Sequence, residues 1–170
     1  MDTATLWERV IDDQSAFREA FFAILGDNSV RYCVIETNAY AEPLISRDLD
    51  VAVATEDLVL VERLLSTRFR VERFEHSLNV SVAGSQLRVQ IQMDPRYSAF
   101  VPRATPREVL GVTLQVAAVE DVLQGKLWAF LDATRRGTKR QKDLADIGRL
   151  IEAYPHLRER VPREVLDRLI

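Results

Sequence analysis

Several residue types are scarce in this sequence of 170 residues, and each scarcity excludes a class of site or protein. The single cysteine, Cys33, excludes an internal disulfide, and its apolar neighbours predict a buried small side chain. The two histidines, His76 and His156, have no second histidine or cysteine at ligand spacing, which argues against a zinc site. No apolar run approaches the ~20 residues that span a bilayer, and no signal-like segment is evident. We therefore expect a cytoplasmic protein without membrane contact.

Short catalytic motifs and a strong net charge are also missing. The sequence contains no P-loop motif and no serine in a nucleophile elbow, which excludes P-loop NTPases and hydrolases of that kind. A net charge of −3 does not favour general affinity for nucleic acid. Basic residues nevertheless gather in one short segment, as Arg135, Arg136, Lys139, Arg140 and Lys142. This cluster either meets phosphates or is the solvated start of a helix, and the sequence leaves both open.

Hydrophobic periodicity predicts a single α+β domain over residues 1–170, in which helices flank a small mixed sheet. Helical spacing of apolar residues predicts helices at 6–24, 56–67, 119–131 and 139–154, with a shorter one after Pro162. Alternation predicts strands at 69–71, 78–82 and 87–93. Two further strands are expected, a short one at 31–36 and one at 48–54, where two aspartates open an apolar run. The sheet core is expected at about 28–115, with an irregular stretch at about 95–106, and a helical C-terminal part at 116–170.

Two aspartates open one predicted strand, in the order Asp48-Leu49-Asp50. Successive side chains on a strand point to opposite faces, so the two carboxylates share one face. Carboxylates held that closely repel each other, and a divalent cation is the natural compensation. The pair therefore predicts a magnesium site for phosphate transfer, with polar residues at the mouth of a strand as the alternative.

Sites of this kind usually take a third carboxylate from a neighbouring strand. The polar face of the predicted strand 87–93 instead carries Gln90, whose amide oxygen coordinates a cation without adding negative charge. Asp94 shares that face but lies four residues further along, at about 3.3 Å per residue, which is too far to replace Gln90 simply. The alternative is that these glutamines only cover a solvated face of the sheet.

The predicted helix 139–154 carries acids and bases together. Its core stripe is predicted at Leu144, Ile147, Ile151 and Tyr154, and its polar residues off that stripe at Lys139, Lys142, Asp143 and Asp146. The spacing allows the pairs Lys139–Asp143 and Lys142–Asp146, in the order that stabilises a helix less, which mildly favours a directed role over ordinary pairing. Lys126, on the preceding predicted helix, either points at a phosphate or snorkels along the surface.

These elements in this order resemble the minimal nucleotidyltransferase superfamily, which has a polymerase-beta-like fold. The resemblance is nearest to the bacterial nucleotidyltransferases of the AbiEii toxin type and their relatives. The similar segments are 32–35, 38–43, the strand with Asp48 and Asp50, 87–97, 120–129 and 139–151. The last is fairly specific, because Lys142-Asp143-Leu144-Ala145-Asp146 matches the family pattern K-D-x-x-D.

The resemblance implies magnesium-dependent transfer of a nucleotide from an NTP to RNA, such as tRNA, or to a protein. It also implies a toxin–antitoxin context, with an antitoxin or another protein as partner. The implied catalytic residues are Asp48, Asp50, Lys126 and Asp143, expected to face one cleft. The implied ligands of Mg²⁺ are Asp48, Asp50 and Gln90, and the implied nucleotide contacts are Thr37, Asn38 and Lys142.

Two departures from the family pattern predict an alternative function. Family members have a Gly-Gly or Gly-Ser turn after the first strand, where backbone N–H groups approach the nucleotide phosphates. Here Glu36-Thr37 stands in its place, and Glu36 adds bulk and a charge that repels phosphate. Gln90 stands where the family has its third carboxylate. The alternative is a catalytically degenerate nucleotidyltransferase fold that acts as a nucleotide- or partner-binding module.

Overall fold

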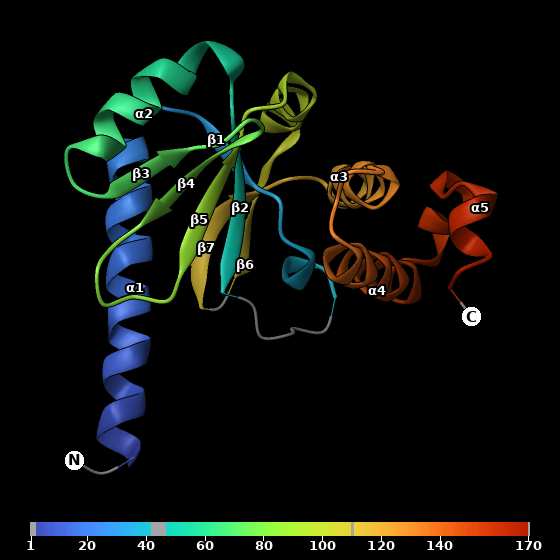
Figure 1. The fold of residues 1–170 in the computed structure, drawn as a ribbon, viewed down its shortest axis with the longest axis horizontal. Coiled ribbons are helices and arrows are strands. Elements are labelled where there is room, and N and C mark those ends of the chain that lie inside the picture. Colours follow the sequence, from blue (N-terminus) through green and yellow to red (C-terminus); the bar gives the residue numbers. More distant parts are fainter. Residues whose placement is uncertain (1–2, 42–46, 110, 170) are drawn as a thin grey trace. The chain divides into compact units, whose positions relative to one another are not determined.

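The computed structural model describes residues 3–41, 47–109 and 111–169, with side chains from residue 14 onward. The chain forms two compact units (Figure 1). Unit 1 comprises residues 1–34 and 46–102, and unit 2 comprises residues 35–45 and 103–170. Residues 42 and 43, which end the similar segment 38–43, lie outside the described residues. The single-domain organisation stays a prediction.

Unit 1 contains five strands in the order β3-β4-β5-β2-β1. Strands β2 and β5 run parallel, and the other neighbouring pairs are antiparallel, so the sheet is mixed as predicted. The strand bounds are β1 Tyr32–Val34, β2 Asp48–Val53, β3 Arg70–Arg73, β4 Ser77–Ser81 and β5 Arg88–Gln92. All five overlap the segments predicted as strands, three of them from alternation. The β4–β5 connection turns at Gly84, whose φ of +87° suits glycine.

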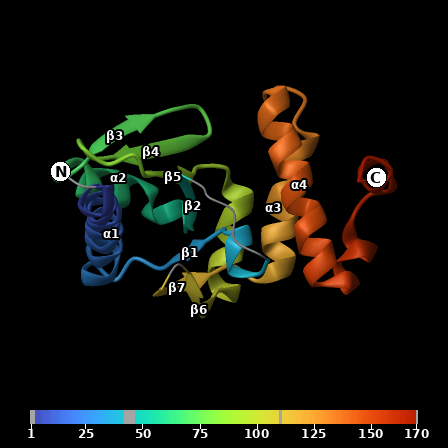
Figure 2. The ribbon, with the colours of Figure 1, turned by 90° about the horizontal axis from the view of Figure 1, so that it is seen from below.

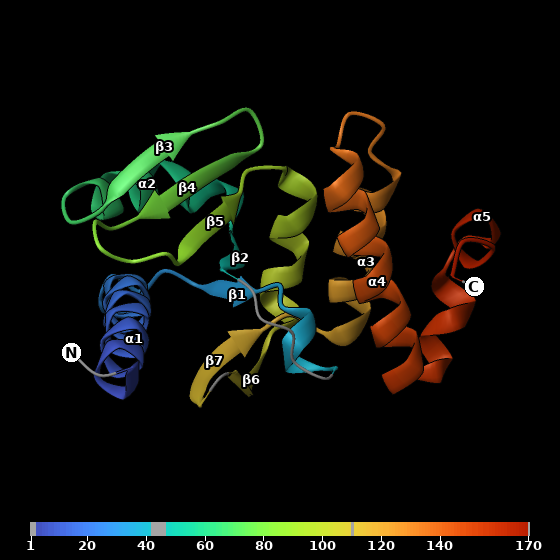
Figure 3. The ribbon, with the colours of Figure 1, turned by 60° about the horizontal axis from the view of Figure 1, so that its bottom comes forward.

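One face of this sheet is buried by two helices, α1 (Thr3–Asp27) and α2 (Leu58–Ser66). Figure 3 shows α2 behind β3 and β4. Alternate residues of the central strands are buried, as Leu49 and Val51 show on β2. The helices and strands supply the core side chains Phe17, Phe21, Leu25, Val61, Leu65, Leu78, Val80, Val89 and Ile91. Alternation therefore separates an apolar face from a polar face, as expected for a sheet covered on one side.

Unit 2 pairs two helices, α3 (Val119–Leu131) and α4 (Gly137–Ala153), which lie side by side (Figure 2). Its strands, β6 (Thr105–Val109) and β7 (Val112–Val116), form an antiparallel hairpin. The remaining elements are η1 (Thr37–Ala39), η4 (Pro155–Arg160) and α5 (Arg163–Leu166). The core side chains include Val122, Leu123, Leu127, Phe130, Ile147, Leu150, Leu157 and Val165.

Two segments differ from the sequence prediction. The stretch expected to be irregular contains a 3₁₀ helix, η3 (Pro95–Arg103), and β6 begins immediately after it at Thr105. The hairpin was not predicted. Strand β6 has no apolar alternation, since of its five residues only Val109 is buried, whereas β7 does alternate, at Val112, Leu114 and Val116, and this signal was missed. Pro106 within β6 is also an unfavourable strand signal. Among the described helices, none combines the length and apolar character that a membrane crossing requires.

Candidate functional site

The polar face of unit 1 brings together the residues predicted to bind a metal. Asp48 and Asp50 are both partly exposed, while Leu49 between them is buried, so the carboxylates share a face as predicted. The parallel neighbour β5 places Arg88 beside Asp48 and Gln90 beside Asp50. Gln90 thus occupies the position on the neighbouring strand where a third ligand would lie.

Arg88 holds one of the two carboxylates. Its Nε donates a hydrogen bond to Asp48 Oδ1 at 3.1 Å. The side chains of Asp48 and Arg88 are 32% and 54% exposed, so solvent reaches both partners. The sequence analysis did not single out Arg88. The register Asp48↔Arg88, which follows from the parallel pairing of β2 and β5, would have indicated it.

Asp94 has a different partner and lies beyond the end of β5. The backbone N–H and guanidinium of Arg96 donate to the Asp94 carboxylate at 2.8–3.0 Å. These hydrogen bonds hold the pKa of Asp94 below its ordinary value. Within the described ranges 3–41, 47–109 and 111–169, no group of three or more His, Cys, Asp or Glu residues is placed to hold a metal ion. The candidate donor set on β2 and β5 is therefore two carboxylates and one amide, a set whose oxygens suit Mg²⁺ chemically but carry little charge.

In unit 2, Asp143 and Asp146 lie on the buried face of α4, which corrects the prediction that they lie off the core stripe. The buried residues of α4 are Asp143, Asp146, Ile147, Leu150 and Ile151. This i, i+3, i+4, i+7, i+8 spacing is one helix face. The predicted stripe was rotated away from it because it counted only apolar residues. Two carboxylates therefore occupy the first turns of a core-facing stripe, where they need compensating charge.

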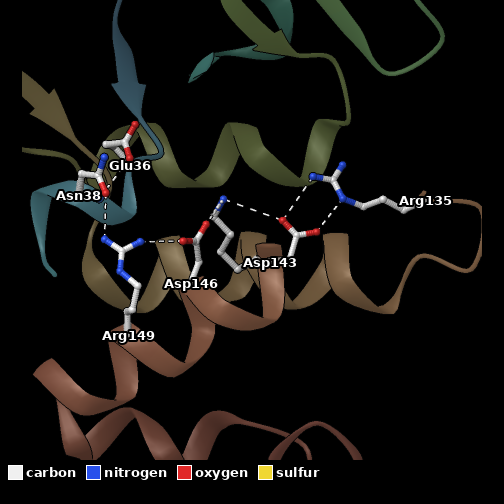
Figure 4. Close-up of polar contacts among 7 residues, drawn as sticks. Glu36, Asn38, Arg135, Asp143, Asp146 and Arg149 are labelled. Carbon is white, nitrogen blue, oxygen red and sulfur yellow. Dashed lines mark hydrogen bonds and ion pairs between the residues drawn. The ribbon is translucent and has the colours of Figure 1, made fainter. Parts of the chain in front are cut away.

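Three cations supply that charge (Figure 4). Lys126 Nζ lies 3.1 Å from Asp146 Oδ2 and 4.0 Å from Asp143 Oδ1. Arg135, in the loop before α4, donates to Asp143 at 2.6 and 3.3 Å. Arg149 donates to Asp146 at 2.8 Å. Asp143 and Asp146 therefore pair with these three cations, whereas ordinary helix pairing with Lys139 and Lys142 was the alternative that the spacing left open. Lys126 is an internal ion-pair partner rather than a snorkelling side chain.

The same network reaches the segment that replaces the family's glycine turn. Arg149 donates to Asn38 Oδ1 at 3.0 Å, and the Asn38 backbone N–H donates to Glu36 Oε1 at 3.1 Å (Figure 4). Glu36 is thus the side-chain cap of the short helix η1. Thr37 is buried, and its hydroxyl has no hydrogen-bond partner. A backbone N–H that a phosphate would use in a glycine turn is therefore already bound to a carboxylate.

Further side chains of unit 2 hold η1 in place, and the sequence analysis did not select them. Arg107 on β6 donates to the Ala39 carbonyl at 3.2 Å and stacks over the Tyr40 ring at 4.2 Å. The Tyr40 hydroxyl donates to the Ala117 carbonyl at 2.5 Å, and burial raises the pKa of this tyrosine. Such contacts are long-range pairings that no local sequence pattern predicts.

The basic cluster lies at the start of α4 and is largely exposed. Arg136, Lys139 and Lys142 are exposed, whereas Arg140 donates to the Phe130 carbonyl at 3.0 Å and Arg135 is engaged with Asp143. Lys142, a predicted nucleotide contact, is therefore accessible to solvent. Cys33 is fully buried, as predicted, and the side chains of His76 and His156 are exposed.

Comparison of the sequence with known families decides which family this arrangement belongs to. Residues 42–169 match the family described as nucleotidyl transferase AbiEii toxin, of a type IV toxin–antitoxin system. The matched range contains β2, β5, α3 and α4, which carry the aspartates and Lys126. The chain belongs to this nucleotidyltransferase family. No curated protein matches it in sequence.

Solved structures show the same fold at low sequence identity. The solution structure of the antibiotic-resistance factor ANT(2″)-Ia is 11% identical, with a TM-score of 0.56 over 88% of this chain and 93% of that one. The crystal structure of ANT(2″)-Ia in complex with adenylyl-2″-tobramycin is also 11% identical, with a TM-score of 0.55 over 87% of this chain and 98% of that one. These similarities confirm the predicted nucleotidyltransferase-like fold.

Proposed function

We propose that this chain transfers a nucleotide from an NTP to RNA or to a protein, with Mg²⁺ as cofactor, as the toxin of a toxin–antitoxin pair. The observation that carries the proposal is the placement of Asp48 and Asp50 on one accessible face of β2, beside Gln90. Membership in the family supplies the reaction class. The acceptor, the antitoxin partner and the choice of Mg²⁺ as the metal are all parts of this proposal.

Asp48, Asp50 and Gln90 would hold the cation. Their donors are two carboxylates and an amide oxygen, which are ligands that Mg²⁺ accepts. When bound at such a site, Mg²⁺ neutralises and positions the phosphates of the NTP. The chain's own contribution is to fix these donors on adjacent parallel strands, so that little reorganisation is needed when the nucleotide binds.

Lys126 and Asp143 take a positioning role in this proposal. Both are engaged in the ion-pair network that joins α3 to α4, and through Asp146 and Arg149 that network also holds Asn38. Thr37 and Asn38 remain proposed nucleotide contacts, although the Thr37 hydroxyl is buried in this structure. Lys142 is the exposed cation proposed to meet phosphate. That Asp48, Asp50, Lys126 and Asp143 act on one nucleotide stays a prediction.

A second candidate function is a nucleotide- or partner-binding module without catalysis. Three observations favour it. Glu36 places a carboxylate on the Asn38 N–H, Gln90 brings no charge to the metal, and Arg88 already pairs with Asp48. Each of these lowers the expected affinity for an NTP–Mg²⁺ complex.

Incubation with each α-³²P-labelled NTP, Mg²⁺ and total RNA separates the two functions. We expect the native chain to label RNA, or itself or an added protein, with one NTP, and Asp50→Asn to abolish labelling. The control is Gln92→Asn, because Gln92 lies on the same strand as Gln90 but outside the register pairs that involve Asp48 and Asp50.

Two results of this experiment would contradict the proposed transfer reaction or its metal site. If no NTP is transferred but equilibrium dialysis shows that an NTP binds, the binding-module function is correct and catalysis is not. If Asp50→Asn labels as well as the native chain, β2 is not the catalytic strand, and the metal assignment is wrong.

A further inference from the structure

Arg88 is the one charged side chain on β5 that is in register with either of the two aspartates. It lies two residues before Gln90 on the same strand and the same face, and its guanidinium contacts Asp48 at 3.1 Å. Asp50 is in register with the neutral Gln90 instead. The two carboxylates of the candidate metal site are therefore unequal, because one has a cationic neighbour across the strands and the other has an amide.

The charge on this face is correspondingly small. Asp48 and Asp50 contribute two negative charges and Arg88 returns one positive charge, so the four side chains Asp48, Asp50, Arg88 and Gln90 carry −1 together. A face with a third carboxylate and no arginine would carry −3. Because a divalent cation is attracted by net negative charge, both differences act in the same direction and weaken its binding.

We propose that Arg88 is an internal counter-ion that competes with the divalent cation for Asp48, and so sets how much metal the site requires. The proposal rests on the proposed metal role of Asp48 and Asp50. A cation that is to use the Asp48 carboxylate must displace the guanidinium or share the carboxylate with it. Asp50 and Gln90 are then the donors that a cation meets without displacing Arg88.

The exposure of the pair makes this exchange feasible. An exposed arginine–carboxylate pair contributes little net free energy, so a cation can break it at small cost. The guanidinium remains tethered to β5 after release, however, and its charge stays near the bound cation. The competition should therefore lower metal affinity by a modest factor rather than abolish binding.

The test is Mn²⁺ binding, measured from the loss of the free Mn²⁺ signal in electron paramagnetic resonance. We expect Arg88→Gln to tighten Mn²⁺ binding about three- to tenfold. The matched control is Arg70→Gln, because Arg70 is also an exposed arginine in an ion pair on this sheet, with Glu72 on the edge strand β3. The control should change the affinity less than twofold. Equal effects of the two variants, or no effect of Arg88→Gln, would overturn the proposal.

A double-mutant cycle separates direct competition from a general charge effect. If Arg88 acts by holding Asp48, then Arg88→Gln should gain clearly less affinity in the Asp48→Asn background, because there is no carboxylate to release. An undiminished gain would show that Arg88 acts through net charge alone and would refute the competition.

Asp50→Asn separates failure of this inference from failure of the proposed function. If Asp50→Asn leaves Mn²⁺ binding unchanged, the metal site itself is wrong, and both proposals fall. If Asp50→Asn abolishes binding while Arg88→Gln is neutral, the metal site stands and only the role of Arg88 is refuted.

Discussion

The aspartates of unit 1 and those of unit 2 are partnered in opposite ways. On β2, the Asp48 side chain is 32% exposed, and its arginine partner is 54% exposed. On α4, the side chains of Asp143 and Asp146 are 2% and 5% exposed, and Lys126 between them is 16% exposed. An exposed carboxylate exchanges its counter-ion cheaply, whereas a buried one loses much stability if its partner is removed. The comparison indicates that β2 offers a site for an exchangeable cation and that α4 offers a fixed support.

This difference bears on how the family's sequence pattern should be interpreted. The K-D-x-x-D pattern of α4 attracts attention as a set of charged catalytic candidates. In this chain both of its aspartates form part of the core stripe, and their cations come from α3, from the loop before α4 and from α4 itself. The aspartates of this pattern therefore form ion pairs that hold α4 against α3. A catalytic role of Lys126 and Asp143 depends on these ion pairs.

The largest effect is expected for the buried aspartates of α4. Lys126→Met removes the ammonium group that lies between two buried carboxylates. We expect a loss of about 3 kcal/mol in the free energy of unfolding, at the low end of the range for a broken buried pair, because each aspartate keeps one arginine. Urea unfolding followed by circular dichroism measures the loss. The control is Lys142→Met on the exposed face of α4, expected to change stability by less than about 0.5 kcal/mol.

If Lys126→Met and Lys142→Met have the same free energy of unfolding, the buried ion pairs of α4 contribute no more to stability than a surface charge does. That result would contradict the contrast between the exposed and the buried aspartates. A large loss for Lys126→Met would also qualify activity measurements on this residue. Loss of nucleotide transfer in a destabilised variant does not identify a catalytic residue, so the unfolding measurement has to precede the activity assay.

A smaller effect is expected at the exposed aspartates of β2. Gln90→Asp places a third carboxylate beside Asp50, and we expect Mg²⁺ binding to tighten about tenfold, measured by calorimetry. The matched control is Gln92→Asp, two residues further along the same face of β5 and outside the register of Asp50. Similar tightening in both variants would indicate a general charge effect. No tightening by Gln90→Asp would place the metal away from position 90.

Glu36, directly before η1, is a further carboxylate whose contact can be tested by substitution. Its carboxylate accepts the Asn38 N–H, the type of donor that a glycine turn would present to phosphate. We expect Glu36→Ser to tighten binding of a fluorescent NTP about threefold in the absence of metal, because a charge that repels phosphate is removed while serine can still cap η1. Glu75→Ser, at an exposed position of unit 1, is the control for net charge. Weaker binding by Glu36→Ser would show that the cap itself shapes a nucleotide site.

The strands and helices with an apolar pattern were predictable, and the partners of charged groups were not. Alternation located β3, β4 and β5, an apolar run after two aspartates located β2, and helical spacing located α3 at its observed bounds. In the β6–β7 hairpin, β6 is mostly exposed and gives no alternation signal, whereas the alternation of β7 was present in the sequence and was missed. The burial of Asp143 and Asp146 was not predicted, because hydrophobic periodicity treats every carboxylate as a surface residue. In this structure three cations compensate the charge of the two buried carboxylates.

The candidate site was predictable to the level of single strands. The face shared by Asp48 and Asp50 follows from the two-residue period of a strand, and both aspartates lie as that period requires. Arg88 was not predicted, because its contact with Asp48 depends on parallel pairing between strands separated by about forty residues. Register is set by the whole sheet, so an ion pair across strands cannot be inferred from either strand alone.

The smallest expected effect concerns Asp94 and Arg96, a second exposed pair in unit 1 that follows β5. Arg96 holds the pKa of Asp94 below its ordinary value of 3.8. A depressed pKa in the folded state means that the pair stabilises fully above the unfolded value and loses its contribution as the pH falls through the folded value. Arg96→Gln should therefore lower the free energy of unfolding by less than about 1 kcal/mol at pH 6, and the difference should shrink only below about pH 4. Thermal unfolding of both forms at several pH values tests this. A difference that persists at the lowest pH at which both forms still fold would show that Arg96 stabilises unit 1 by packing and not through the Asp94 charge.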